Sequence, residues 1–361
     1  MESEGEYPHP SGRIIEALRK GMVIPAHPLA LHPDRTLDEA HQRALSCYYL
    51  EAGAGGLAVG VHTTEFAIHE PKVGLYRPVL ELAMETARGW KRPDSNEPPV
   101  MIAGIIGRTD QAVREAETAR RLGYDIGLLG LGALKDLDDD RLVEHARNVA
   151  RVLPIMGFYL QPAVGGRVLS EGFWRRLAQI PNLMAVKIAP FNRYYTLSVI
   201  RAVAEERKAG QVALYTGNDD SILLDLLTPY EIATQRGTVR LEVVGGLLGH
   251  WAFWTRRAVE QLKQVRTARR RGVVPLELLT LAAQVTESNE AVFDAANGFR
   301  GCIAGILYVL KSSGLVGGVH PLGPEERLSP GQAERIDAVT AHYPQLNDHQ
   351  FVRENLERWL A

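Results

Sequence analysis

A lysine lies within an apolar stretch of the chain, in the run 183–188 that ends Val186-Lys187-Ile188. A lysine in such a segment must pair with a carboxylate, extend to the protein surface or be held as the neutral amine. Desolvation disfavours the ammonium form, and the neutral amine is a nucleophile that attacks ketones. The segment alone leaves two interpretations open, an imine-forming lysine and a surface lysine paired with an acid.

A tyrosine precedes this lysine by 28 residues, in the segment Phe158-Tyr159-Leu160-Gln161-Pro162. If the two segments form neighbouring strands, we expect Tyr159 and Lys187 to lie close together. A phenol beside the amine can transfer protons during imine formation and carbon–carbon bond cleavage. The alternative is a packed aromatic ring with a satisfied hydroxyl group. The pair favours the imine-forming interpretation.

Short apolar runs alternate with longer amphipathic segments from about residue 21, as expected for βαβ units. The Val, Ile and Leu content of the runs is typical of strands buried on both faces, and eight such strands favour a (β/α)8 TIM barrel. A doubly wound sheet is the alternative, although no Gly-x-Gly-x-x-Gly motif opens the first helix. The predicted strands are 22–26, 56–60, 100–104, 126–130, 155–160, 183–188, 212–216 and 240–244.

The pattern after the eighth strand becomes helical, with helices predicted over 251–265, 276–287, 289–297 and 301–312. We therefore divide the α/β chain into an N-terminal arm (1–20), the barrel (21–265) and a C-terminal helical extension (266–361). Four side chains are predicted to cap helix N-termini, namely Asp38, Thr109, Asp138 and Ser170.

Reactive groups in a (β/α)8 barrel come from the carboxyl ends of the strands and from the loops that follow. This rule selects His27 after the first strand and the segment His62 to Glu65 after the second. It also selects Asn218 and Asp219 after the seventh strand, and the segment Gly245 to His250 after the eighth. We expect Asn218, Asp219, Gly245 and His250 to bind substrate.

Composition limits the classes of partner. The 361 residues are 45% hydrophobic and carry a formal net charge of −2, so no long-range field favours nucleic acid or an anionic membrane. Two cysteines, distant in sequence, indicate neither a disulfide framework nor a thiolate metal site. The acidic, polar N-terminus and the lack of an eighteen-residue apolar run predict a cytoplasmic protein.

The two reactive segments resemble those of the dihydrodipicolinate synthase and N-acetylneuraminate lyase superfamily, over roughly residues 21–345. Tyr159 to Pro162 is similar to that family's Tyr-Asn-x-Pro segment, and Pro181 to Lys187 is similar to its Pro-Asn-ϕ-x-Gly-ϕ-Lys strand, with Ala185 in place of the glycine. The resemblance implies an imine between Lys187 and pyruvate or another 2-oxo acid. It further implies that no cofactor or metal is needed and that the protein forms a homo-oligomer, a dimer or a tetramer.

The loop after the second strand, Gly60 to Glu65, resembles the family's Gly-Thr-Thr-Gly-Glu loop, which holds the substrate carboxylate and joins the proton relay. Alignment on Glu65 places His62 and Thr63 at the hydroxyl positions, whereas a one-residue insertion places Thr63 and Thr64 there. Thr63 fits both alignments and is the expected carboxylate ligand.

Two departures from the family affect the expected substrate and relay. Val164 stands where the synthases have an arginine for a second carboxylate, and the nearest arginine is Arg167. The family's Pro-Tyr-Tyr motif is replaced by Leu-Gly-Leu-Gly-Ala-Leu at 129–134, so a relay tyrosine is missing. His62 could replace it, because an imidazole titrates near neutrality.

The expected activity is therefore that of a Schiff-base lyase, either an aldolase or a dehydratase. The expected substrate is pyruvate or a 3-deoxy-2-oxo sugar acid, and a dihydrodipicolinate synthase is disfavoured. One alternative is a metal-dependent barrel hydrolase using His27, His62, Asp219 and His250, although such hydrolases usually have His-x-His after the first strand. A second alternative is a catalytically idle barrel that binds a metabolite.

Overall fold

The computed structural model describes residues 7–90, 97–206, 208–323 and 325–361, so the first six residues of the predicted arm lie outside it. Two compact units divide these residues. Unit 1 comprises residues 1–22, 100–218 and 225–246, and unit 2 comprises residues 23–99, 219–224 and 247–361. Each unit is built from segments distant in sequence, and each is described by itself. The proposed division into arm, barrel and extension follows the order of the chain instead.

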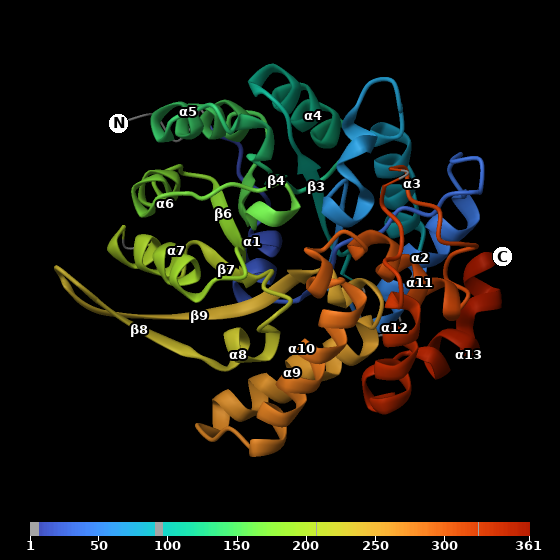
Figure 1. The fold of residues 1–361 in the computed structure, drawn as a ribbon. Coiled ribbons are helices and arrows are strands. Elements are labelled where there is room, and N and C mark those ends of the chain that lie inside the picture. The colour runs from blue at the N-terminus through green and yellow to red at the C-terminus, as the bar shows by residue number, and fades with distance from the viewer. Residues whose placement is uncertain (1–6, 91–96, 207, 324) are drawn as a thin grey trace. The chain divides into compact units, whose positions relative to one another are not determined.

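Unit 1 contains a parallel sheet in the order β9-β7-β6-β5-β4-β3, with helices packed along it (Figure 1). Each strand is followed by a helix that returns the chain, as parallel pairing requires. The strands are β3 (Val100–Ile105), β4 (Ile126–Leu129), β5 (Ile155–Leu160), β6 (Leu183–Ala189), β7 (Ala213–Thr216) and β9 (Gly237–Leu248). The helices are α1 (Gly12–Lys20), α4 (Thr109–Leu122), α5 (Asp139–Ala150), α6 (Glu171–Ala178) and α7 (Arg193–Glu205), and α8 (Ile222–Leu227) crosses the boundary between the units.

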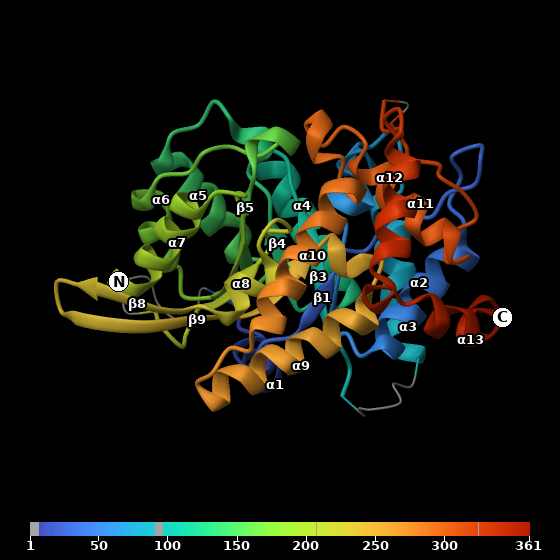
Figure 2. The same cartoon turned by 60° about the horizontal axis from the view of Figure 1, so that its bottom comes forward.

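Unit 2 contains the other two parallel strands, β1 (Val23–Pro25) and β2 (Gly56–Val59), joined by a bridge between Ala26 and Ala58. Its helices include the C-terminal group shown in orange and red in Figures 1 and 2. The Gln332 side chain connects parts of this group by donating hydrogen bonds to the Val292 and Gly301 carbonyls. The helices are α2 (Glu39–Ala52), α3 (Tyr76–Gly89), α9 (Thr255–Arg271), α10 (Leu276–Val292), α11 (Cys302–Ser312), α12 (Gln332–His342) and α13 (His349–Leu360).

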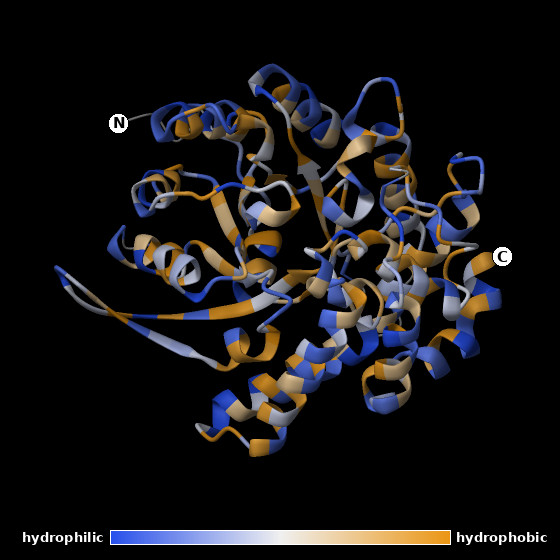
Figure 3. Cartoon of the chain, viewed as in Figure 1, coloured by the Kyte–Doolittle hydropathy of each residue, from blue (hydrophilic) through white to orange (hydrophobic). Residues whose placement is uncertain are grey.

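The eight predicted strands all form, and they give a (β/α)8 barrel with a helical C-terminal part. Every residue of β6 is buried, and Figure 3 shows this strand in hydrophobic colours while the helices beside it carry hydrophilic stripes. Burial on both faces is the reason that a continuous apolar run predicts such a strand. Among the described residues, no helix is long and apolar enough to cross a membrane.

One strand was not predicted. β8 (Pro229–Thr234) pairs antiparallel with β9 and forms an extended hairpin that is clear in both ribbon views (Figures 1 and 2). Side chains along β8 alternate between exposed and half-buried. The continuous apolar run that marks a buried strand is therefore absent from this segment, and only the 240–244 part of β9 was predicted.

Three of the four predicted helix caps are confirmed, because the side chains of Asp38, Asp138 and Ser170 accept hydrogen bonds from backbone amides in the first turn of α2, α5 and α6. The prediction for Thr109 was wrong. This residue is the first of α4, and its hydroxyl group lies 3.0 Å from His145 Nδ1. The predicted helix over 289–297 is also corrected, since α10 continues to Val292 and a separate 3-10 turn follows it.

Candidate active site

Lys187 lies on β6 with 6% of its surface exposed, within unit 1. Its register partners are Phe158 on β5 and Tyr215 on β7. Paired residues of parallel strands project from the same face of a sheet, so the three side chains share one face. The Lys187 Nζ atom lies 4.2 Å from the centroid of the Phe158 ring. The lysine side chain is therefore largely shielded from water, with an aromatic face beside its amine.

Gly217, at the carboxyl end of β7, provides space for the lysine side chain. A Cβ atom at this position would lie 2.8 Å from Lys187 Cε and 2.7 Å from Ala189 Cβ. Both distances are shorter than van der Waals contact allows, so a larger residue would displace the lysine side chain. The residue type alone does not reveal this role, which becomes visible only in the packing.

Tyr159 lies on the opposite face of the sheet from Lys187, because its register partner is Ile188. Its ring packs against Trp174 of α6 and Tyr195 of α7, with centroids 5.3 and 5.8 Å away. Its hydroxyl group accepts from the Leu169 amide at 3.3 Å and lies 3.4 Å from the Leu169 carbonyl oxygen. The expected contact between the phenol and the lysine is therefore not formed in this structure, and a catalytic role for Tyr159 stays an untested prediction.

A one-residue register shift accounts for this difference. Ile155 pairs with Leu183, but the next pair joins Met156 to Ala185, so β6 contains one extra residue at this point. Without the shift, the initial register would continue and pair Tyr159 with Lys187. Because side chains alternate between faces, a shift of one residue turns Phe158 toward the lysine in place of the tyrosine.

Tyr159→Phe tests this placement. We expect imine formation at Lys187 to stay within about threefold of the wild type, because the phenol faces the helices. Removal of the hydroxyl group leaves the Leu169 amide without its partner and should lower the free energy of unfolding by about 1 kcal/mol. Chemical denaturation and the rate of borohydride trapping measure the two effects. A decrease in the trapping rate of about a hundredfold or more would show that Tyr159 takes part in the reaction at Lys187.

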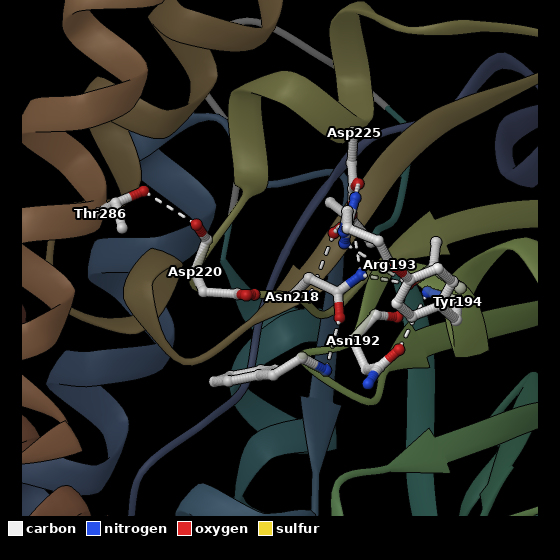
Figure 4. Close-up of polar contacts among 10 residues, drawn as sticks. Asn192, Arg193, Tyr194, Asn218, Asp220, Asp225 and Thr286 are labelled. Atoms are coloured by element: carbon white, nitrogen blue, oxygen red, sulfur yellow. Dashed lines mark hydrogen bonds and ion pairs between the residues drawn. The ribbon is translucent and has the colours of Figure 1, made fainter.

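Asn218, expected to bind substrate, connects the loops that follow β6 and β7 (Figure 4). Its side-chain oxygen accepts from the Phe191 amide at 3.0 Å, and its nitrogen donates to Thr196 Oγ1 at 3.2 Å and to Asp225 Oδ2 at 2.9 Å. Asp225 also forms an ion pair with Arg193. The Asn218 side chain is fully buried and occupied by these bonds, which hold the two loops together, and its role in substrate binding stays a prediction.

In unit 2, the loop after β2 is fixed against the end of β1. The Thr63 hydroxyl group donates to the Ala26 carbonyl oxygen at 2.7 Å, and the Thr64 hydroxyl group donates to that of His27 at 2.6 Å. The Thr64 oxygen also accepts from the amides of Gly60 and Val61, at 3.0 and 3.1 Å. The Thr64 hydroxyl group is thus fully used within the protein, and its role as a substrate ligand stays a prediction.

The Thr63 hydroxyl group keeps hydrogen-bonding capacity for a ligand. The Thr63 oxygen donates one hydrogen bond and retains acceptor capacity, as well as the capacity to redirect its proton. His62 opens the 3-10 helix His62–Thr64 and is half-buried, with its ring edge-on to Phe66 at 5.7 Å between centroids. Thr63 as carboxylate ligand and His62 as acid or base remain proposals.

His27 has both ring nitrogens occupied by the protein. Nε2 lies 2.8 Å from Ser46 Oγ, and Nδ1 lies 3.0 Å from Gln42 Nε2. Complete burial lowers the pKa of His27 to about 4, so the ring is neutral at pH 7. These contacts leave His27 no position for a metal ion and disfavour the hydrolase alternative. Among the described residues, no group of three or more His, Cys, Asp or Glu side chains could hold a metal ion.

His250 and Asp219, both predicted to bind substrate, are attached to α10 within unit 2. His250 Nδ1 lies 2.6 Å from Asn289 Oδ1, and its amide donates to Asp219 Oδ1 at 2.9 Å. Asn289 Nδ2 in turn donates to the Asp219 carbonyl, and Thr286 donates to the carbonyl of Asp220 (Figure 4). Burial lowers the pKa of His250 to about 4. These contacts fix the positions of both residues, and their roles in substrate binding stay predictions.

Gly245 is required by a close backbone approach. A Cβ atom at this position would lie 2.4 Å from the Met22 carbonyl oxygen and 2.9 Å from Tyr215 Cε1. The glycine therefore permits close packing against Met22, and its role in substrate binding stays a prediction.

Glu65 is a buried acid whose importance was not predicted. Its carboxylate accepts from the Leu322 amide at 2.9 Å and from the Gly323 amide at 3.3 Å. Burial raises its pKa from 4.5 to about 7, with a further increase from Glu326 that is opposed by the two amides and by Arg35. No local pattern could reveal this contact, because its partners lie 257 and 258 residues away.

Glu65→Gln should remove a pH dependence of stability. The pKa of Glu65 is higher in the folded protein, so the stability gained from its proton is complete below pH 4.5 and lost as the pH rises through about 7. The stability of the wild type relative to E65Q should therefore fall between pH 5 and pH 8, by up to about 3 kcal/mol. Denaturation at each pH measures this difference, with exposed Glu70→Gln as the control. A pH-independent difference would contradict the assignment.

Comparisons with known proteins show which sequences and folds this chain resembles. No family model matches the chain. A 4-hydroxy-tetrahydrodipicolinate synthase of Desulforamulus reducens is 26% identical over 214 residues, which are 58% of this chain and 66% of that protein. The synthase of Cyanothece sp. is 26% identical over 213 residues, covering 57% of this chain and 66% of its own length. The chain thus spans just under two thirds of the length of these curated relatives.

Solved structures show the same fold. The N-acetylneuraminate lyase from Fusobacterium nucleatum matches with a TM-score of 0.69 at 17% identity, covering 90% of this chain and 99% of that one. A prophage protein of the dihydrodipicolinic acid synthase family from E. coli K12, solved with pyruvate, matches with a TM-score of 0.72 at 17% identity, covering 90% and 98%. The sequence similarity to the synthases and the fold shared with these solved structures support a divergent relative of the dihydrodipicolinate synthase and N-acetylneuraminate lyase superfamily.

Compared with the family segments that it resembles, the chain keeps the strand lysine and differs in the residues around it. Phe158 is the residue of β5 that faces Lys187, whereas the tyrosine of the family-like segment faces the helices. The arginine expected after that segment is replaced by Val164. The nearest arginine, Arg167, donates hydrogen bonds to the Leu134 and Leu137 carbonyls. The divergence therefore affects proton transfer and substrate selection more than the lysine.

Proposed function

We propose that the protein is a class I, Schiff-base-forming lyase that acts on a 2-oxo acid, either as an aldolase or as a dehydratase. The observation that carries the proposal is the position of Lys187, buried on a barrel strand with its amine over the Phe158 ring and its side chain passing Gly217. Catalysis through a covalent imine needs an amine that is desolvated and fixed in position. Burial shields the Lys187 side chain from water, and packing against Phe158 and Gly217 restricts its position.

In the proposed reaction the neutral Lys187 amine attacks the ketone carbon of the 2-oxo acid, which forms a C–N bond and gives a carbinolamine. Protonation of its hydroxyl group and loss of water give the protonated imine. When the C3–C4 bond breaks, its electron pair moves toward the imine and produces an enamine, while the C4 hydroxyl proton passes to a base and the C4 fragment leaves as an aldehyde. Protonation at C3 and hydrolysis then release the shortened 2-oxo acid and the free amine.

A dehydratase would use the same imine. Removal of a C3 proton gives the enamine, which expels the C4 hydroxyl group as water after protonation. We assign Thr63 and the amides of its loop to the substrate carboxylate, and His62 to proton transfer. These two roles follow from the chemistry of the residues and from the resemblance of the loop to the family.

The substrate class is supported by the relatives. The curated relatives are named as synthases of 4-hydroxy-tetrahydrodipicolinate, and a solved neighbour of the same fold holds pyruvate. The replacement of the synthase arginine by Val164 argues against that synthase activity in this chain. Pyruvate or a 3-deoxy-2-oxo sugar acid is therefore the proposed substrate. Homo-oligomerisation and a cytoplasmic location stay predictions.

A panel of 2-oxo acids tests the function. The purified protein is incubated with pyruvate, 2-oxobutyrate and 3-deoxy-2-oxo sugar acids, with borohydride to trap imines and with separate assays for aldehyde release and for dehydration. We expect a covalent adduct with at least one 2-oxo acid and turnover of a sugar acid. Absence of any adduct across the panel would refute the proposal.

The idle-barrel alternative has one observation in its favour, because Phe158 stands where a proton-transferring phenol would face the lysine. It predicts that 2-oxo acids bind without adduct or turnover. Calorimetric binding combined with the trapping panel separates the two functions.

A further inference from the structure

Glu65 connects two segments of unit 2 that are distant in sequence. It directly follows the Thr63-Thr64 pair, and its carboxylate accepts hydrogen bonds from Leu322 and Gly323. Only 5% of its surface is exposed. A buried carboxylate that accepts hydrogen bonds from backbone amides is held in one orientation. Loss of these bonds would leave the buried carboxylate and the amides unpaired, which costs free energy.

The backbone at Glu65 is also held in an unusual conformation. Its φ is 63° and its ψ is 118°, in a region that side chains other than glycine rarely adopt. Such a conformation persists only where the surroundings fix it, here by the carboxylate contact on one side and the hydroxyl contacts of Thr63 and Thr64 on the other.

The C-terminal segment 316–323 depends on the same contact. Among these eight described residues, only Leu322 and Gly323 form hydrogen bonds to another segment of the chain, and both donate to Glu65. The segment contains no helix or strand. Its polar connection to a distant part of the chain is therefore the pair of amides that donate hydrogen bonds to the Glu65 carboxylate. Movement of the segment would therefore act on Glu65, two residues from Thr63.

We propose that Glu65 is a positioning residue that couples the C-terminal segment 316–323 to the loop 60–65, so that docking of this segment sets the orientation of Thr63 for the substrate carboxylate. The coupling to substrate rests on the proposed function, while the attachment of the two segments does not. Loss of the contact frees the segment and the loop together. It weakens binding of the 2-oxo acid and leaves the chemistry at Lys187 intact.

Glu65→Ala, Glu65→Gln and the control Glu70→Gln test the proposal in the full-length protein. Glu70 is an exposed acid of the same region, paired with Lys72 outside this contact. Amide hydrogen exchange is measured over residues 60–65 and 316–323, together with KM and kcat for the 2-oxo acid identified by the panel. E65A removes both acceptor oxygens, whereas E65Q keeps one oxygen that can accept from both amides and provides a folded comparison.

We expect E65A to accelerate exchange in both segments by about tenfold or more, to raise KM by about tenfold and to change kcat by less than about twofold. E65Q should lie between E65A and the wild type, and E70Q should match the wild type. Faster exchange in 316–323 alone, or an unchanged KM with a lower kcat, would overturn the coupling. If the wild type forms no imine adduct, the proposed function fails, and the exchange of the two segments still decides whether Glu65 joins them.

Discussion

Replacing Lys187 with methionine is expected to abolish imine trapping and to lower kcat/KM by at least about a thousandfold, because the covalent route loses its nucleophile. Methionine is unbranched and of similar length, so it can follow the same path over Gly217 and against the Phe158 ring. The fold should be retained, since an apolar side chain replaces an amine at a site with 6% exposure. Steady-state kinetics and the trapping reaction measure the effect.

Lys135→Met is the matched control, because Lys135 is exposed and lies outside the proposed site. It should keep wild-type kinetics and the full extent of trapping. Retention of substantial turnover in K187M, with circular dichroism like that of the wild type, would show that the reaction does not pass through this amine.

Gly217→Ala is expected to produce the second-largest loss, of about a hundredfold in kcat/KM. The added methyl group would lie 2.8 Å from Lys187 Cε and 2.7 Å from Ala189 Cβ. The lysine side chain can move and Ala189 cannot, so the amine is displaced by a distance that matters for attack on a ketone. Overpacking should also lower the free energy of unfolding by about 1–3 kcal/mol. Kinetics and denaturation measure the two effects separately.

Gly12→Ala is the control for the glycine substitution. Gly12 is the first residue of α1, and a Cβ atom there would meet no atom within 4 Å. We expect wild-type kinetics and unchanged or slightly higher stability, because alanine favours a helix more than glycine does. Wild-type trapping by G217A would mean that Gly217 does not determine the position of the amine.

The barrel could be predicted from the sequence because its strands are buried on both faces. The runs 155–160 and 183–188 correspond closely to β5 and β6, since short continuous apolar segments between amphipathic helices are typical of buried parallel strands. β8 could not be predicted in the same way. It pairs in an exposed hairpin, and its alternating burial leaves only a weak period-two signal.

The candidate site was only partly predictable. Lys187 was identified from its type and surroundings, but the face occupied by Tyr159 depends on a one-residue shift between Ile155 and Met156. Residue spacing does not reveal such a shift, although the shift changes which face of the sheet each later side chain shares with the neighbouring strand. Polar residues at strand ends present a related difficulty. Asn218 and His250 have the residue types expected of a binding site and are instead occupied by bonds within the protein.

The contact between Glu65 and Leu322 was also beyond sequence reasoning. The acid belongs to a recognisable loop, while its partner is a backbone amide, which every residue except proline carries. Residue type therefore gives no indication of the pairing, and only the folded chain reveals it.

The central claim, that Lys187 forms an imine with a 2-oxo acid, is tested most directly by peptide-resolved borohydride trapping. Wild-type protein and K187M are incubated with pyruvate and borohydride, digested, and analysed by mass spectrometry. The account predicts one reduced pyruvyl adduct on the wild-type peptide that contains Lys187, its absence without pyruvate, and no adduct in K187M. A wild-type peptide with unmodified Lys187 across the full panel of 2-oxo acids, or an adduct on another lysine that persists in K187M, would contradict the account.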